Sequence, residues 1–178
     1  MYRLFVAIDP PESVRRRLGE LQTGIPGATW KEESEFHLTV RFIGEVDGAS
    51  FSDILSSLKI VRMEPFEVEI SGIGQFPLRG DPRSLWAGIK SGEALRTLRN
   101  RIERTLRDVG ISTERRKFHP HITLARLRNT PIERVAYFLQ GSALFQAPPF
   151  LASEFHLYSS QKTSSGAIHT LESSYSLK

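Results

Sequence analysis

The chain has 178 residues, of which 39% are apolar and 25% charged, so it is neither a disordered nor a fibrous sequence. It contains no cysteine, which excludes a disulfide framework and a thiolate metal site. Its net charge of +4 favours a polyanionic partner without requiring one. No apolar run approaches the roughly 20 residues that span a bilayer, and the opening residues indicate a buried strand rather than a signal peptide. We therefore expect a cytoplasmic protein with no membrane partner.

The first half of the chain alternates strand and helix patterns. Leu4–Ile8 is a continuous apolar run, typical of a buried strand. A helix start at Asp9–Glu12 precedes apolar residues at helical spacing, and residues 37–40 alternate as in a strand. Residues 51–61 show helical periodicity, and a further strand covers 65–70. The half therefore reads as strand, helix, strand, helix, strand.

The second half repeats this order of elements. Its predicted elements are a strand over 85–89, a helix over 91–110, a strand over 121–124, a helix over 131–140, a strand from 149–150 and a last strand over 167–171. The first strands of the two halves lie 81 positions apart, and the later elements lie 84 apart (121 − 37 = 84). This correspondence predicts an internal repeat of about 1–83 and 84–178.

A duplicated β-α-β-α-β unit predicts an α+β fold with two antiparallel sheets. An approximate two-fold axis between the halves would place equivalent surfaces face to face across a central cleft. The stretch 72–82 is rich in Gly and Pro and is predicted to be a loop, but it is too short for an interdomain linker. We therefore expect one bilobal domain over 1–178, and a monomer because the cleft is built within one chain.

One four-residue pattern occurs in both halves, as residues 37–40 and 121–124, and reads His-x-Thr-x with aliphatic residues at x. In a strand, side chains alternate between faces, so His37 and Thr39 share one face, as do His121 and Thr123. The opposite face of each strand is apolar and suited to a core. Two such strands facing each other would bring two imidazoles and two hydroxyls to one cleft.

These four side chains suit acid–base chemistry on a phosphodiester. An imidazole titrates near pKa 6.5, so one ring can take a proton from water while the other donates one to the departing oxygen. The threonine hydroxyls can donate hydrogen bonds to the non-bridging oxygens, where negative charge builds. No metal is expected, because two His without a third converging ligand fall short of a zinc site. The residues alone leave open which His is the acid.

Other polar and aromatic residues carry weaker signals. His119 is interpreted as structural or as a residue that orients His121, because Pro120 limits regular pairing there. Phe76, in the predicted loop, is interpreted as core or as a stacking surface for a base. The remaining candidates have no functional interpretation and are assigned to the core or to structural roles: His156, His169, Trp30 and Trp86.

The sequence resembles the 2H phosphoesterase superfamily, named for two His-x-Thr/Ser-x motifs. The resemblance rests on Arg3–Ile8, Phe36–Glu45, Pro82–Ile89 and Phe118–Arg126. Within the superfamily it is most similar to RNA 2′,3′-cyclic phosphodiesterases, once described as 2′-5′ RNA ligases. The resemblance implies metal-free hydrolysis of an RNA 2′,3′-cyclic phosphate, or of a cyclic nucleotide, to a 2′-phosphomonoester, without a cofactor.

The resemblance also implies roles for individual residues. His37 would be the proton donor and His121 the proton acceptor, while Thr39 and Thr123 would hold the phosphate. Arg126 would be a phosphate-binding cation, although simple alternation points it away from His121. A bulge or strand end near Ala125 would remove that conflict.

Arg41 is expected to face the cleft, because it lies four residues after His37 in the same strand pattern. It would then be a second phosphate-binding cation.

Two alternatives to hydrolysis stay open at this point. The same two His could run the reverse reaction and join a 5′ hydroxyl to the cyclic phosphate in a 2′-5′ linkage, although abundant water favours hydrolysis. A third possibility is a binding module that holds RNA ends without turnover. A nucleotide cofactor is not indicated, since no Gly-rich phosphate loop of the Walker type occurs.

Overall fold

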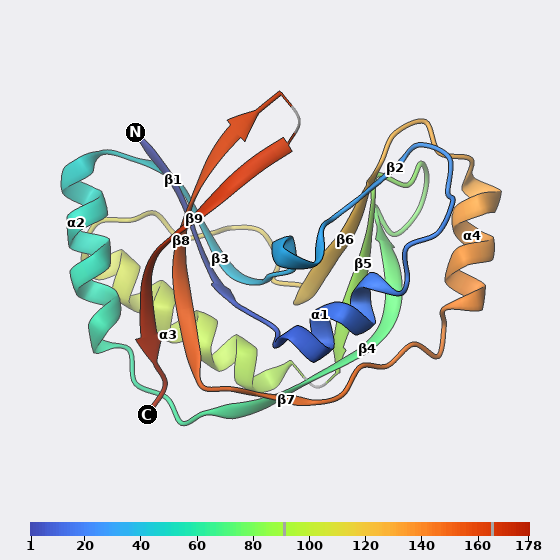
Figure 1. Cartoon of the computed structure of the whole chain (residues 1–178). Coiled ribbons are helices and arrows are strands. Elements are labelled where there is room, and N and C mark those ends of the chain that lie inside the picture. The colour runs from blue at the N-terminus through green and yellow to red at the C-terminus, as the bar shows by residue number, and fades with distance from the viewer. Residues whose placement is uncertain (91, 165) are drawn as a thin grey trace.

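The computed structural model describes residues 1–90, 92–164 and 166–178 (Figure 1). Its strands are β1 (Tyr2–Ile8), β2 (Ala28–Trp30), β3 (Leu38–Val46), β4 (Phe66–Phe76), β5 (Ser84–Lys90), β6 (His121–Leu127), β7 (Phe150–Ala152), β8 (Glu154–Thr163) and β9 (Gly166–Ser176). Its helices are α1 (Glu12–Gly19), α2 (Gly48–Ser57), α3 (Glu93–Asp108) and α4 (Ile132–Gly141), with short 3-10 turns at Glu33–Glu35 and Leu58–Ile60.

The strands form one curled antiparallel sheet in the order β7-β4-β5-β6-β3-β1-β8-β9, with β2 beside β6. The two predicted sheets are the two ends of this sheet, and they meet where β3 pairs with β6 at Leu38 and Ile122. These two residues are equivalent in the repeat (122 − 38 = 84), so the pseudo-two-fold axis passes through the pair. The predicted α+β class and its duplication are confirmed.

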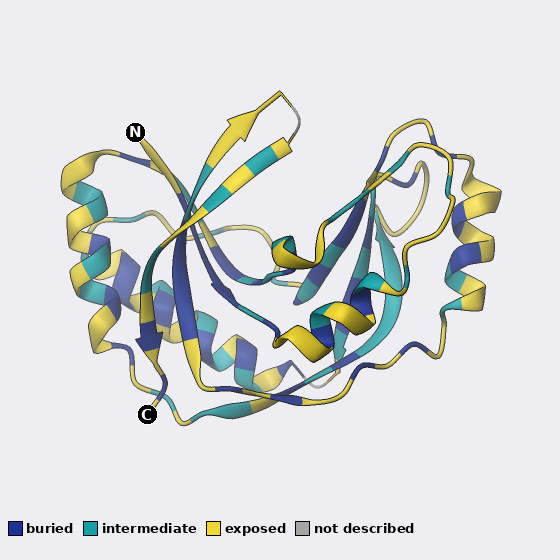
Figure 2. Ribbon diagram, viewed as in Figure 1, coloured by how far each residue is buried: buried dark blue, intermediate teal, exposed yellow. Residues whose placement is uncertain are grey.

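The helices cover the outer, convex side of the sheet, and each half lends one helix to the other. Arg41 of β3 forms an ion pair with Glu103 of α3, so the first helix of the second repeat packs behind the first. The Arg17 guanidinium of α1 lies 5.1 Å from the Phe145 ring, which belongs to the second half. Figure 2 shows the buried faces of helices and strands turned toward each other. This exchange ties the two halves into one folding unit.

Helix α3 illustrates how the sequence pattern becomes structure. Leu95, Leu98, Ile102 and Leu106 recur at intervals of three or four, and all are buried. Gly110 follows the helix with a φ of +84°, the left-handed conformation that commonly ends a helix. Within the described residues, no helix is both long enough and apolar enough to cross a bilayer.

The predicted loop 72–82 is wrong for its first five residues, because β4 runs on to Phe76 and pairs with β5 up to Ser84. The glycines that indicated a loop have a packing role. A Cβ on Gly74 would lie 2.3 Å from a ring carbon of Trp86, so the absent side chain makes room for the indole. Phe76 therefore lies on a strand.

Candidate active site

Each motif strand carries a one-residue bulge directly after its Thr. Against β1, Ala7 pairs with Thr39 and Val6 pairs with Arg41, which leaves Val40 as the extra residue. Against β5, Trp86 pairs with Thr123 and Leu85 pairs with Ala125, which leaves Leu124 as the extra residue. A bulge shifts the alternation of every side chain that follows it. The matching bulges decide the positions of both candidate cations.

Arg41 does not face the cleft, so that prediction is wrong. The bulge turns its side chain to the core side, where it is 4% exposed. There its guanidinium contacts Glu103 and donates to the Ser112 carbonyl at 2.6 Å. Alternation from His37 failed because a bulge at Val40 cannot be seen in the sequence. Arg41 holds α3 against β3.

Arg126 lies on the same face as His121 and Thr123. Simple alternation would place it on the opposite face, but the bulge at Leu124 reverses the orientation of the residues that follow. Its side chain is exposed, and its charge is close enough to lower the pKa of His169. Its counterpart in the first half is Phe42 (126 − 42 = 84), which is 52% exposed. One half therefore offers a cation where the other offers an aromatic ring.

The antiparallel pairing of β3 with β6 places the two motifs opposite each other. Pairing of Leu38 with Ile122 places His37 across from Thr123 and Thr39 across from His121. Four polar side chains thus gather at the two-fold axis, on the concave face of the sheet. This is the arrangement that the repeated motif predicted.

The ring of His37 is held by a carboxylate. Its Nδ1 lies 2.8 Å from Oδ1 of Asp9, the residue that directly follows β1. The Tyr158 hydroxyl donates to Oδ2 of Asp9 at 2.6 Å, and the Tyr158 ring centroid lies 4.7 Å from that of His37. His156 and Arg15 each approach Oδ2 to 3.7 Å. One carboxylate therefore anchors a cluster behind His37.

The Asp9 carboxylate stays ionised. Burial by itself would raise its pKa, but the hydrogen bonds from His37 and Tyr158 outweigh burial and hold the pKa below its usual value. Burial and the same hydrogen bond raise the pKa of Tyr158, so its hydroxyl keeps its proton. An ionised carboxylate only accepts, so His37 must carry a proton on Nδ1. Its Nε2 is left for a substrate.

The ring of His121 is held by a backbone carbonyl instead. Its Nδ1 lies 2.6 Å from the His119 carbonyl oxygen, which only accepts, so this Nδ1 also carries a proton. Phe76 lies edge-on at 4.9 Å between ring centroids, and Trp86 lies at 6.1 Å. Burial lowers the pKa of His121, although the bond to the carbonyl works in the opposite direction. The neutral ring, with a free electron pair on Nε2, is therefore favoured.

Trp86 is not the core residue that the sequence indicated. It shares the concave face with Thr123, its partner across the β5–β6 ladder, and its ring centroid lies 4.8 Å from that of His119. The interpretation of His119 as an orienting residue fits its carbonyl, which positions His121.

A cavity of about 420 Å³ opens beside His37. Its lining residues are Asp9, Arg15, Ser34, Glu35, His37, Tyr158, Ala167, Ile168 and His169. The His169 ring centroid lies 5.7 Å from that of His37, and burial, followed by the charge of His37, lowers the pKa of His169. The structural interpretation of His169 is therefore wrong, because the residue lines the site.

Sequence reasoning missed Asp9, Tyr158 and His169. For Asp9 a signal existed, since an acid at the end of a buried strand lies beside whatever strand pairs with it. For Tyr158 and His169 no local pattern could have shown that the last hairpin returns to the first motif.

A duplicated α+β unit with one His-x-Thr-x strand in each half defines the 2H phosphoesterase class. The model of the LigT-like phosphoesterase family matches residues 8–86 and 89–169, and the chain belongs to this family. A Thermus thermophilus protein named RNA 2′,3′-cyclic phosphodiesterase is 35% identical, over 99% of this chain and 90% of that protein. One of the same name from Aeropyrum pernix is 43% identical over 61% of this chain, and the match spans 64% of that protein's length. The crystal structure of TT0787 of T. thermophilus superposes with a TM-score of 0.83 at 26% identity, covering 98% of this chain and 97% of that one.

Proposed function

We propose that this protein hydrolyses RNA 2′,3′-cyclic phosphodiester ends to 2′-phosphomonoesters by acid–base catalysis between two histidines. The observation that carries the proposal is the contrast between the two Nδ1 partners, a carboxylate for His37 and a carbonyl for His121. The names of the T. thermophilus and A. pernix relatives support hydrolysis of an RNA 2′,3′-cyclic phosphodiester.

The contrast supports His37 as the acid and His121 as the base. An imidazolium at His37 is compensated by the ionised Asp9 beside it. At His121 no carboxylate touches the ring among the described residues, and burial favours the neutral form, whose Nε2 can accept a proton. Thr39, Thr123 and Arg126 are the candidate ligands of the non-bridging phosphate oxygens.

The reaction balances with protonic groups alone. Water attacks phosphorus and gives a proton to Nε2 of His121, while the bond from phosphorus to the 3′ oxygen breaks. That oxygen takes the proton from Nε2 of His37 and leaves as a 3′ hydroxyl, so the phosphate remains on the 2′ oxygen. Exchange with solvent then returns both rings to their starting states. Each general acid or base in such a step contributes about 10²–10⁴-fold.

Phe76 is the candidate stacking surface for a base on the His121 side, since its ring lies beside both His121 and Trp86. Tyr158 occupies the equivalent place beside His37. Phe76 is the ladder partner of Ser84 on β5, and Tyr158 is in the same way the ladder partner of Phe5 on β1.

The test is incubation with adenosine 2′,3′-cyclic phosphate in EDTA, followed by phosphorus NMR of the product. A 2′-phosphate is expected, and its loss in both His37→Ala and His121→Ala would tie it to the site. A 3′-phosphate would mean that the two histidines serve the opposite leaving group. No turnover of this nucleotide or of a short RNA with a cyclic end would overturn the proposal in favour of a binding module.

A further inference from the structure

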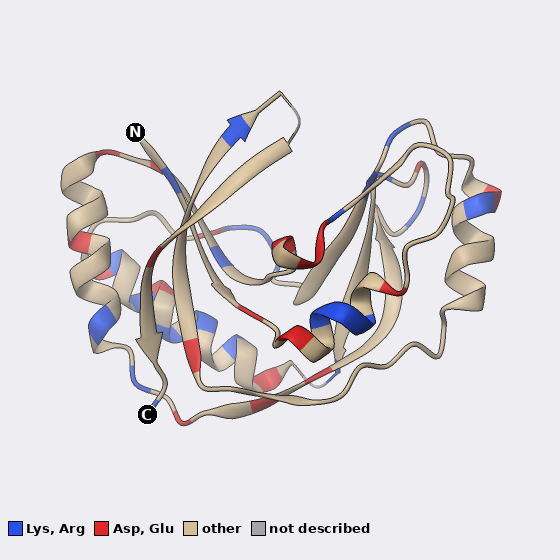
Figure 3. Ribbon diagram, in the orientation of Figure 1, with Lys and Arg blue, Asp and Glu red and all other residues tan. Residues whose placement is uncertain are grey.

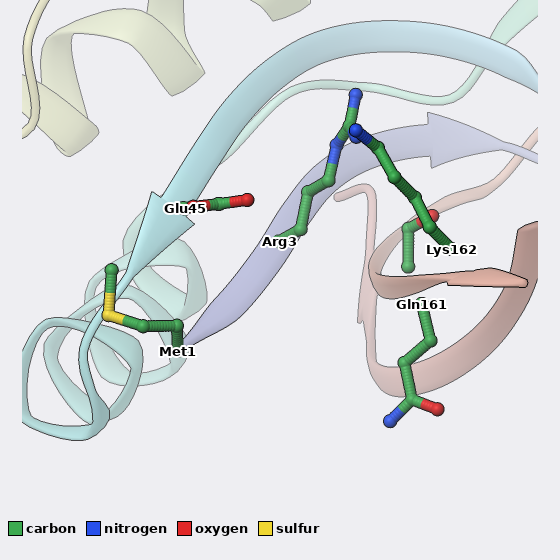
Figure 4. A pocket seen from close by; sticks show the side chains of 6 residues that line it. Met1, Arg3, Glu45, Gln161 and Lys162 are labelled. Atoms are coloured by element: carbon green, nitrogen blue, oxygen red, sulfur yellow. The ribbon is translucent and has the colours of Figure 1, made fainter.

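A second cavity, of about 440 Å³, is lined by residues of β1, β3 and β8, beyond the active site. It is lined by Met1, Arg3, Glu45, Ser160, Gln161 and Lys162. Figure 4 shows Arg3 and Lys162 directed toward the same part of the cavity that both residues line, while the amide of Gln161 points away. The cavity is therefore lined by two cations that come from different strands, β1 and β8.

These cations lie on the same concave face as the two histidines. Arg3 lies two and four residues before Phe5 and Ala7 on β1, and Ala7 is the ladder partner of Thr39. Lys162 lies four residues after Tyr158 on β8, with no register shift between β8 and β1 in the paired stretch. Four residues of strand span about 13 Å, which is roughly four nucleotides at the stacked rise of 3.4 Å and fewer in an extended strand.

The charge of this cavity suits an anion. Among the described residues, neither Arg3 nor Lys162 forms an ion pair with a carboxylate. Glu45 is the one acid among the lining residues, so the cavity keeps a net positive charge. Many other basic residues lie on helices, including α1 and α3 (Figure 3), and on α1 Arg16 and Arg17 form ion pairs with Glu12 and Glu20. Two cations that line one cavity without a carboxylate partner repel each other, and an anion bound in the cavity would be attracted by both.

Three aromatic rings lie between this cavity and the active site. Phe5 stacks on Tyr158 with centroids 5.3 Å apart and an interplanar angle of 14°. Phe42 lies beside Phe5 at 6.1 Å and is half exposed on the same face. Phe5 and Tyr158 are buried, so Phe42 is the ring of the three that a base can reach. Bases of single-stranded RNA stack on exposed aromatic rings, and cations beside them bind the backbone phosphates.

We propose that Arg3 and Lys162 bind a backbone phosphate of the nucleotides that precede the cyclic end, with Phe42 as the stacking surface between this phosphate and His37. The inference rests on the proposed function and specifies its substrate: an oligoribonucleotide rather than a cyclic mononucleotide. A mononucleotide fills the active site but does not reach the two cations, so these residues discriminate by length.

The experiment compares kcat/KM for adenosine 2′,3′-cyclic phosphate and for a hexaribonucleotide with a 2′,3′-cyclic end. In the double variant Arg3→Gln/Lys162→Gln, hexamer kcat/KM falls at least 10-fold through KM, and mononucleotide kcat/KM stays within about twofold. Loss of one neutralised phosphate on a single strand also reduces the slope of log affinity against log salt by about 0.7. The matched control is Arg107→Gln/Arg134→Gln, which removes the same charge from exposed positions on α3 and α4 and leaves the preference for the hexamer intact.

Glu45→Gln provides a change of opposite sign. It removes the one carboxylate from the cavity, so hexamer KM should fall two- to fivefold while the mononucleotide is unaffected. An unchanged ratio of kcat/KM between hexamer and mononucleotide in the double variant would overturn the proposal, whether both values fall equally or neither falls. If the wild-type protein hydrolyses neither substrate, the proposed function fails. The salt dependence of hexamer binding in the wild type and the double variant then decides the Arg3–Lys162 site by itself.

Discussion

The two halves of the molecule have the same strand geometry and different chemistry behind each histidine. Both motifs precede a bulge at the same place, and the sheet axis passes between equivalent residues Leu38 and Ile122. Behind His37 lies an ionised carboxylate, and behind His121 a carbonyl in an aromatic setting. Duplication therefore supplies two rings in matching positions, and divergence of their neighbours gives one ring a charge partner that the other lacks.

The largest expected effect comes from removing either histidine ring. His37→Ala and His121→Ala should each lower kcat on a cyclic nucleotide by about 10²–10⁴-fold. On a p-nitrophenyl phosphodiester, whose leaving group needs no proton, His37→Ala should recover most of its activity and His121→Ala none. Steady-state kinetics on both substrates measures this.

If His121→Ala recovers activity on the p-nitrophenyl diester instead, the roles of acid and base are exchanged. If neither variant recovers activity, neither ring protonates the leaving group. Each variant is compared with the wild-type protein on the same two substrates, with folding checked by circular dichroism.

The next effect concerns the carboxylate that distinguishes the halves. Asp9→Asn leaves a group of the same shape but removes the negative charge beside His37, so kcat on the cyclic nucleotide should fall by about 10²-fold or more. The loss should shrink on the p-nitrophenyl diester, as for His37→Ala, because Asp9 acts through His37. A matched control is Glu35→Gln, which removes a carboxylate from the same cavity without a contact to the ring.

An equal loss on both substrates would show that Asp9 supports the fold of the site rather than proton donation. A chemical-shift comparison of the His37 ring in the two proteins gives a readout that a purely structural role would not move.

Two arginines distinguish a residue that stabilises the fold from one that acts in the active site. Arg41→Met leaves the partly buried Glu103 carboxylate without its cation and should lower the free energy of unfolding by about 2–4 kcal/mol, with kcat little changed. Arg126→Gln, at an exposed position on the concave face, should change stability by no more than about 0.5 kcal/mol and lower kcat/KM instead. Urea denaturation and kinetics on the same samples measure both quantities.

The double variant Arg41→Met/Glu103→Leu is the control, since removing both charges should return part of the lost stability. A loss of kcat without a loss of stability in Arg41→Met would restore Arg41 to the active site.

Most of the fold follows from local sequence patterns. The errors arise where pairing between strands determines the orientation of a side chain or the length of a strand. The four helices and the polar faces of both motifs rest on periodicities that lie within a dozen residues, and the repeat rests on comparing these local patterns between the two halves. The orientation of Arg41, by contrast, depends on a bulge against β1, and the extent of β4 depends on its pairing with β5. The contact between Asp9 and His37 joins residues 28 positions apart, and that with Tyr158 spans 149. Such contacts are set by topology, which residue periodicity does not contain.

The smallest effect concerns the pH profile. His121 must be neutral to accept a proton, so kcat/KM falls as pH drops through its pKa. Burial lowers that pKa, and the charge of His119 lowers it further, so the acidic limb should have its midpoint below the ordinary value of about 6.5. His119→Gln keeps the carbonyl that holds Nδ1 but removes the neighbouring charge, so the midpoint should rise by a fraction of a unit. An acidic limb at or above 6.5 in the wild type, or a downward shift in His119→Gln, would contradict His121 as a buried base. Proton NMR titration of the His121 ring assigns the limb to this residue.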